Sequence, residues 1–352
     1  MWTLIGARAV QAVGAAVLTP ASLGLILSVL PATRRAGAVR IWAVTSSFAG
    51  ALGPVIGGLL TEVSWRWAFL LNLPVGLIAF VPAVRLLPDG LPSSRPRMPD
   101  PVGAIAIAVT VGAVSLGLVM TGSWGSGRLL STAVVALAAL ALLIHRVRTH
   151  PAPVIPPELF RVPSFRVANL TILTFTAAFG AVFLSVSLWM GTVAGYGPLQ
   201  AGLALLPGPL MVPLVAALTQ RWAAGAAPGH VVSAGLALFG AGSLLLTIQG
   251  GGQYAGDILP GWMTIGAGIG IAMPTLIATA TTDLAPVDAA TGSGVVNTAR
   301  QTGYALGIAG LVAILGAEEA RAFRHGWTFV TAVVLISAVT ALFIRQTGNQ
   351  DR

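Results

Sequence analysis

The sequence predicts an all-α integral membrane protein, and three observations support this prediction. Of the 352 residues, 56% are hydrophobic and only 8% are charged, whereas soluble domains carry roughly 25% charged residues. Apolar runs of the length that a bilayer requires, about 20 residues, recur along the whole chain. No run alternates apolar and polar residues as half-buried strands do. Because so apolar a chain cannot cover a globule with polar surface, its expected surroundings are a lipid bilayer.

Eleven apolar runs are expected to be membrane-spanning helices. The runs cover residues 2–30, 39–61, 67–87, 101–121, 129–145, 166–190, 199–219, 231–249, 258–282, 289–316 and 326–344. The seventh run contains Pro207, Pro209 and Pro213, and each proline removes a backbone hydrogen-bond donor. Because lipid offers the freed carbonyl groups no hydrogen bonds, we expect these groups to find partners inside the protein.

The basic residues predict the orientation of these runs. All 19 are arginines, the formal net charge is +9, and most of the arginines stand singly between apolar runs. This distribution does not form the basic patch of a nucleic-acid-binding face. Thirteen arginines lie in alternate connections or near the C-terminus, and only four lie in the opposite connections. Because cytoplasmic loops carry the excess of arginine, the C-terminus is predicted to be cytoplasmic.

The composition argues against several chemistries. The chain has no cysteine and therefore no disulfide, zinc thiolate or cysteine nucleophile. Its four histidines stand apart near the ends of runs, so no metal site is expected. No GxxxxGKS or GxxxxGKT motif occurs, so ATP is not expected as the energy source, and neither a cofactor nor an enzymatic activity is predicted. All ten acidic residues lie in loops or at the ends of runs; Glu62 and Arg66 are expected to form a weak surface pair.

The stretch AGALGPVIGGLL at 49–60 carries a stripe of small residues. The stripe consists of Gly50, Gly53, Gly57 and Gly58, at spacings of three and four, with Pro54 among them. On a membrane helix such a stripe lets a second helix approach to backbone distance. The proline bends the helix. Ordinary helix packing is the alternative to a specialised role.

Two arginines, Arg8 and Arg300, lie inside apolar runs. A charge at bilayer depth costs about 2.5–3.5 kcal/mol on insertion scales and usually faces a cavity or a partner. Asn297, Arg300, Gln301 and Tyr304 recur at spacings of three and four, so they share one helix face, which we expect to line a cavity. Interhelical hydrogen bonding is the alternative for this face. For Arg8 the alternative to a functional role is snorkelling to the outer surface.

The stretch 49–60 and the following WRWAFLLNLPVG at 65–76 together resemble the antiporter motif of the major facilitator superfamily. Within that family they resemble the fourteen-helix drug:proton antiporter branch. GSGVVNTARQTGYALG at 292–307 and YGPLQAGLALLPGPL at 196–210 are also similar to the family. The resemblance implies a major facilitator superfamily helical bundle, with about eleven transmembrane helices in this chain and two pseudo-symmetric halves.

The stretch GARAVQAVGAAVLTP at 6–20 resembles the arginine motif of the family's fourth helix. The resemblance implies that Arg8 and Gln11 couple the movement of protons and substrate. In the family this coupling runs through an acidic residue on the first helix. Ala12 departs from the motif, which usually has glycine at this position.

An internal repeat predicts how the chain is organised. GAAVLTP at 14–20 and GIGIAMP at 268–274 correspond at the same offset that relates ALG at 51–53 to ALG at 305–307. Parallel copies of this kind are typical of transporters built from two halves. Three runs precede the later copy within its half and none precedes the earlier copy, so three N-terminal helices are expected to be absent. The predicted parts are 1–87, the remainder of the N-terminal half with three helices; 88–165, two inserted helices with cytoplasmic loops; and 166–352, a complete six-helix C-terminal half.

The predicted function is secondary active transport in the cell membrane. As the resemblance implies, the chain would export lipophilic or cationic drugs or toxic compounds in exchange for protons. Its expected partners are the lipid bilayer, a small amphipathic substrate and protons, with neither nucleic acid nor ATP. Two alternatives stay open: an exporter of a specific metabolite or natural product, and an N-terminally truncated, non-transporting membrane fragment.

Overall fold

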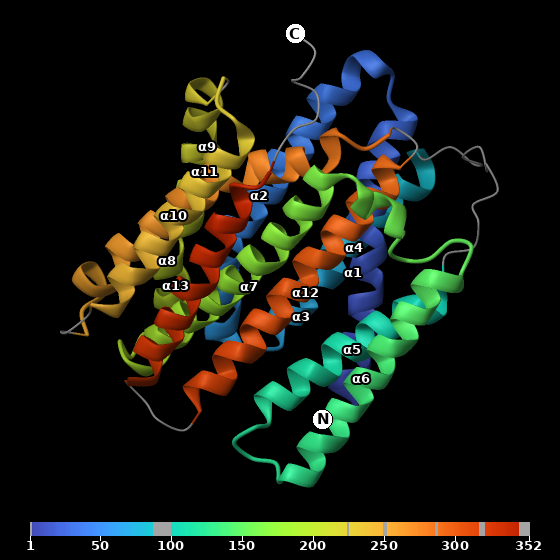
Figure 1. Ribbon diagram of the computed structural model, residues 1–352. Helices are drawn as coiled ribbons and strands as arrows, with labels where there is room; N and C mark the ends of the chain where they lie inside the picture. The colour runs from blue at the N-terminus through green and yellow to red at the C-terminus, as the bar shows by residue number, and fades with distance from the viewer. Residues whose placement is uncertain are drawn as a thin grey trace. The chain divides into compact units, whose positions relative to one another are not determined.

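The computed structural model describes residues 2–86, 100–223, 225–248, 252–285, 288–316 and 321–344, and these residues form helices and connections without a strand (Figure 1). The chain divides into two compact units. The first comprises Met1–Gly53 and Pro74–Ser94, and the second comprises Pro54–Leu73 and Arg95–Arg352. The predicted linker residues 87–99 and the arginine-bearing C-terminal residues 345–352 lie outside the described part of the chain.

The first unit contains α1 (Trp2–Val29), the first two thirds of α2 (Ala32–Val63) and most of α4 (Asn72–Leu86). The helix α2 begins seven residues before the run predicted at 39–61. The added turns contain alanine and arginine, which favour helix, and they follow Pro31 directly. Arg34 and Arg35 therefore lie on a helix and not in a loop.

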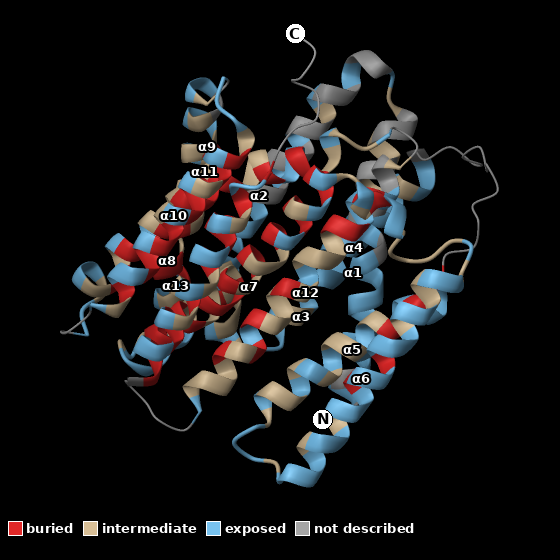
Figure 2. Cartoon of the chain, viewed as in Figure 1, coloured by how far each residue is buried: buried red, intermediate tan, exposed pale blue. Residues whose placement is uncertain are grey.

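The second unit is built around a bundle of helices from the C-terminal part of the chain. These helices are α7 (Pro163–Thr192), α8 (Pro198–Leu205), α9 (Pro207–Trp222), α10 (Pro228–Thr247), α11 (Leu259–Thr282), α12 (Ala289–Leu315) and α13 (Arg321–Ala341). Helix α7 packs against α12 and α13, while α11 packs against α9 and α10. The buried residues gather along α7, α10, α11 and α13, as the red segments of Figure 2 show.

Glycine allows the closest helix contacts in this bundle. A Cβ atom on Gly307 of α12 would collide with the backbone of Ala177 on α7, and one on Gly268 of α11 would collide with the backbone of α10 at Gly235. In lipid the hydrophobic effect does not drive helices together, so van der Waals contact of this kind supplies the packing energy.

A helical hairpin precedes the bundle in the second unit. Its helices α5 (Pro101–Val119) and α6 (Ser126–Thr149) pack against each other, and α5 also packs against α12. The buried Asp100 caps α5 by accepting a hydrogen bond of 3.0 Å from the Gly103 N–H, and it pairs with Arg146 of α6 at 2.7 Å. The hydrogen bond from Arg146 lowers the pKa of the Asp100 carboxyl to about 2. The pair thus joins the two helices at their polar ends.

Three short elements complete the fold: α3 (Trp67–Leu70), a 3-10 turn (Pro157–Arg161) and a π turn (Tyr254–Ile258) before α11. Within the described residues, eight helical segments are long and apolar enough to cross a membrane. An all-helical, multi-pass architecture is thereby confirmed, while the number of eleven crossings and the division at 87 and 165 stay predictions.

The seventh predicted run is a broken helix. It forms α8 and α9, which meet at Leu206. Pro209 has no N–H to donate to the Leu205 carbonyl, and that carbonyl instead accepts a hydrogen bond of 2.8 Å from the buried Trp262 Nε1. The Tyr254 hydroxyl donates to the neighbouring Ala204 carbonyl at 2.7 Å. The expectation that carbonyl groups freed by the prolines find partners inside the protein is confirmed at Leu205.

Replacing Trp262 with Phe should destabilise the protein by about 1–3 kcal/mol, because the Leu205 carbonyl would stay buried without a donor. Thermal unfolding in detergent measures the change. The matched control is Trp222→Phe, because the Trp222 side chain is 88% exposed. Equal melting temperatures for the two variants would contradict the role of Trp262.

Replacing Asp100 with Asn should loosen the hairpin at neutral pH and remove an acid-sensitive part of its stability. Because the Asp100 pKa falls from 3.8 to about 2 on folding, the stabilisation is nearly complete above about pH 5 and is lost progressively as the pH falls towards 2. Melting temperatures across this range should fall for the unmodified chain and change less for Asp100→Asn. The exposed Glu158→Gln serves as the control, and a parallel acid response in both variants would refute the assignment.

Candidate functional site

The two residues predicted to couple protons and substrate lie together on α1 in the first unit. The Arg8 Nη1 atom donates a hydrogen bond of 2.7 Å to Gln11 Oε1, and both side chains are exposed. Their spacing of three residues brings them onto one helix face. A hydrogen-bonded arginine on a helix of this apolarity is a candidate for function; its role in coupling stays a prediction.

The predicted glycine stripe on α2 makes one tight helix contact within the second unit. A Cβ atom on Gly58 would collide with the Pro198 carbonyl of α8, and a Cβ atom on Gly202 of α8 would collide with the Pro54 carbonyl of α2. The two backbones therefore touch at two points, each through a glycine. The close approach that the spacing predicts is present at Gly58, whereas a Cβ atom on Gly57 would meet nothing within 4 Å.

The other two predicted stripe residues, Gly50 and Gly53, belong to the first unit. Gly202 of α8, which contacts Pro54 of α2, was not predicted. The only sign of this contact in the sequence is that Gly202 follows Pro198 by four residues, within 196–210, one of the stretches that carry the family resemblance.

Glu62, at the end of α2, contacts the start of α8. Its carboxylate accepts a hydrogen bond of 3.2 Å from the Leu199 N–H, one of the donors that the first turn of a helix leaves unpaired. A negative charge is also favourable near this positive end of the helix dipole. The expected pair of Glu62 with Arg66 is wrong: the Arg66 guanidinium lies 5.1 Å from the centre of the Trp65 ring, an alternative stabilisation for an exposed cation.

The polar face of α12 is also organised around an arginine. Arg300 Nη2 donates a hydrogen bond of 2.9 Å to Asn297 Oδ1, while Arg300 Nε is buried and has no partner among the described residues. Tyr304 packs edge-on against Phe179 of α7, with 5.7 Å between the ring centres. Gln301 is exposed. A partly buried arginine with an unused donor can receive an acceptor from a substrate or a neighbouring helix.

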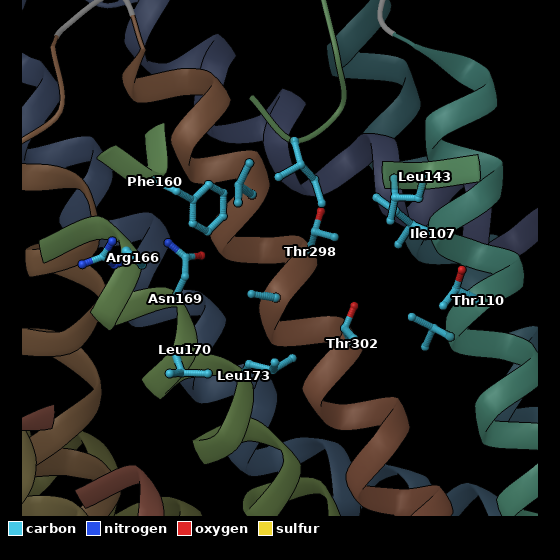
Figure 3. Close-up of a pocket in the computed structure, with 14 residues that line it drawn as sticks. Ile107, Thr110, Leu143, Phe160, Arg166, Asn169, Leu170, Leu173, Thr298 and Thr302 are labelled. Carbon is cyan, nitrogen blue, oxygen red and sulfur yellow. The ribbon is translucent and has the colours of Figure 1, made fainter. Parts of the chain in front are cut away.

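A cavity in the second unit lies beside a different face of α12. It has a volume of about 490 Å³ and is enclosed by residues of α5, α6, α7, α12 and the loop before α7 (Figure 3). From α12 it is lined by Val295, Thr298, Ala299 and Thr302. Asn297, Arg300, Gln301 and Tyr304 do not line it, so a cavity-lining role for these four residues stays a prediction.

Comparison with known proteins adds information over almost the whole chain. The family model described as "Major Facilitator Superfamily" matches residues 1–308. A "Cephamycin export protein CmcT" of Amycolatopsis lactamdurans is 33% identical over 97% of this chain and 73% of its own length. A "Methylenomycin A resistance protein" of Streptomyces coelicolor is 35% identical over 89% of this chain and 66% of its own length. A "Puromycin resistance protein pur8" of Streptomyces alboniger is 34% identical, covering 92% and 66%.

The glycine contact predicts different effects for two neighbouring substitutions on α2. Gly58→Ala should lower the melting temperature, because its methyl group would collide with the Pro198 carbonyl. This carbonyl belongs to the backbone and cannot move away as a flexible side chain could. Gly57→Ala should leave the melting temperature unchanged or raise it, because it has open space and alanine favours helix by roughly 0.5–1 kcal/mol over glycine. Equal shifts of the same sign in detergent would show that the two helices are not in backbone contact.

Proposed function

Because this chain belongs to the major facilitator superfamily, we propose that it exports lipophilic or cationic drugs or other toxic compounds in exchange for protons. It is a multi-pass membrane transporter and not an enzyme. The observation that carries the proposal is its likeness, over most of its length, to proteins named for export of an antibiotic or resistance to one. The fourteen-helix branch, with α5 and α6 as the additional pair, is part of the proposal.

The contact between α2 and α8 supports a role for this helix pair as an interface that opens and closes during transport. Its two crossing points are glycine against backbone, so the closest approach of the two helices involves no side chain. The described polar tie across it is the exposed hydrogen bond from Leu199 to Glu62, of a kind worth about 0.5–1.5 kcal/mol. A smooth contact with one weak tie can open and close at small cost, as alternating access requires.

The two arginine clusters would carry out proton coupling and the binding of polar groups of the substrate. Arg8 with Gln11 in the first unit would couple proton and substrate movement, and Arg300 with Asn297 would hold a polar group of the substrate. The aromatic packing of Tyr304 on Phe179 gives that second cluster an apolar border, which suits an amphipathic substrate. The energy source would be the proton gradient, with no part for ATP or nucleic acid and with the C-terminus in the cytoplasm.

A second candidate is export of one natural product. It is favoured by the relative named as a cephamycin export protein, which matches 97% of this chain. A dedicated exporter would need more directional hydrogen bonds to its substrate than a multidrug exporter, because specificity arises from polar groups that only one ligand satisfies.

The transport proposal is tested in everted membrane vesicles. An imposed proton gradient should drive a fluorescent cationic dye into vesicles that contain the chain, and a protonophore should abolish this uptake. Arg300→Gln should reduce uptake towards background, because the variant loses the cation that holds the polar group. Arg128→Gln, which changes an exposed arginine at the start of α6, should leave uptake unchanged.

Failure of dye uptake under a stable gradient, with the chain present in the membrane, would contradict the multidrug proposal. Uptake of a single compound from a panel of antibiotics under the same gradient would instead support the second candidate. Uptake that persists with the protonophore and needs ATP would contradict both.

A further inference from the structure

The cavity of about 490 Å³ between the hairpin and the bundle is almost entirely apolar. Among its lining residues are Ile107 on α5, Leu143 on α6, and Leu170 and Leu173 on α7. Leu170 is 49% exposed on a helix long and apolar enough to span a membrane, so one wall of the cavity borders the region where lipid chains lie. Side chains that line an unfilled apolar space of this size lose van der Waals contacts. A hydrocarbon chain from the bilayer would restore these contacts.

One buried polar atom faces this space without a partner. Asn169 of α7 is only 5% exposed, and its Nδ2 donates a hydrogen bond of 2.8 Å to the Phe165 carbonyl. Because that bond requires the nitrogen on the carbonyl side, Oδ1 takes the other direction. Oδ1 is buried and lacks a partner in the described part of the chain, and Figure 3 shows it turned towards the side on which Thr298 lies. An O–H or N–H group of a bound molecule would satisfy it.

Two of the three threonines that line the cavity do not supply such a donor. Thr298 donates its hydroxyl hydrogen to the Gly294 carbonyl at 2.9 Å, and Thr110 donates to the Ala106 carbonyl at 2.7 Å. The hydroxyl hydrogens of Thr298 and Thr110 are therefore already used, and each oxygen can only accept a further hydrogen bond. A ligand that enters must be apolar over most of its length and can place a donor, but not an anion, at the depth of Asn169.

The rim of the cavity is cationic. Arg166, in the first turn of α7, contributes to the lining, and in Figure 3 its guanidinium turns away from the other lining residues. A second exposed arginine, Arg161, follows the lining residue Phe160 directly. Arginines in this position bind phosphate groups well and are attracted to anionic headgroups. Asn169 lies three residues further along the helix than Arg166, a rise of about 4.5 Å.

We propose that this cavity binds a monoacyl phospholipid, with its single chain among the apolar side chains and its phosphate at Arg166. In such a lipid a free glycerol hydroxyl lies between the phosphate and the chain, which is the order of Arg166, Asn169 and the apolar lining. A lipid with two chains has an ester in place of that hydroxyl and offers Asn169 Oδ1 no donor. The proposal concerns the hairpin and bundle alone and does not depend on drug transport.

The test is a binding measurement on the purified full chain in detergent, by native mass spectrometry, with monooleoyl lysophosphatidic acid as the probe. The analogue that lacks the glycerol hydroxyl should bind about 3- to 10-fold more weakly, as expected for one hydrogen bond. In Asn169→Leu this difference should disappear. Asn72→Leu is the matched control. Like Asn169, Asn72 donates to a nearby backbone carbonyl, at 3.1 Å, but it is exposed and lies outside the cavity.

Two further variants keep the test independent of any folding defect in Asn169→Leu. Arg166→Gln should weaken binding of the phosphate-bearing lipid and leave binding of uncharged monooleoylglycerol unchanged. Ala299→Phe should fill the cavity and abolish binding of both. The proposal is overturned if the hydroxyl makes no difference in the unmodified chain, if Ala299→Phe binds normally, or if dioleoyl phosphatidic acid binds as tightly as the monoacyl lipid.

Discussion

Direct contact between helix backbones at glycine is the constraint on which the rest of this structure depends. Helices α7 and α12 touch at Gly307, α10 and α11 touch at Gly268, and α2 and α8 touch at Gly58 and Gly202. Each glycine weakens its own helix by roughly 0.5–1 kcal/mol, and the contacts between helices must offset that loss. A contact that excludes even a methyl group sets how closely the two helices approach each other.

The short helix α8 shows how backbone hydrogen bonds are completed where the chain is broken. At its start the Leu199 N–H meets the Glu62 carboxylate of α2, and near its end the carbonyls of Ala204 and Leu205 accept from Tyr254 and Trp262. In lipid an unpaired backbone group costs several kcal/mol, so these partners make the break between α8 and α9 possible. One end of α8 is held by an exposed hydrogen bond and the other by a buried indole, so less free energy is needed to break the hydrogen bond at the end near α2.

Local patterns in the sequence predict the helices well, because apolar runs, prolines and glycine spacings act over a few residues. The bond between Arg300 and Asn297 follows from their spacing of three residues. The bond between Asp100 and Arg146, 46 residues apart, does not. The same limit explains why the contact at Gly202 and the partner of Glu62 were missed. Periodicity shows which face of a helix carries the small or polar residues, but it does not show which helix packs against that face. The cavity is less predictable still, since it is a gap in the packing of four helices.

Helix α12 connects the two candidate sites of the second unit, because its opposite sides belong to different surroundings. One side carries Arg300 and Asn297, and the other carries Thr298 and Thr302 at the cavity. A rigid helix cannot turn or shift on one side alone. A molecule in the cavity that binds one position of α12 more tightly than another therefore shifts the position of Arg300 by that difference in binding free energy, and by no more. By the same linkage, whatever binds at Arg300 changes the affinity of the cavity for its occupant by an equal factor.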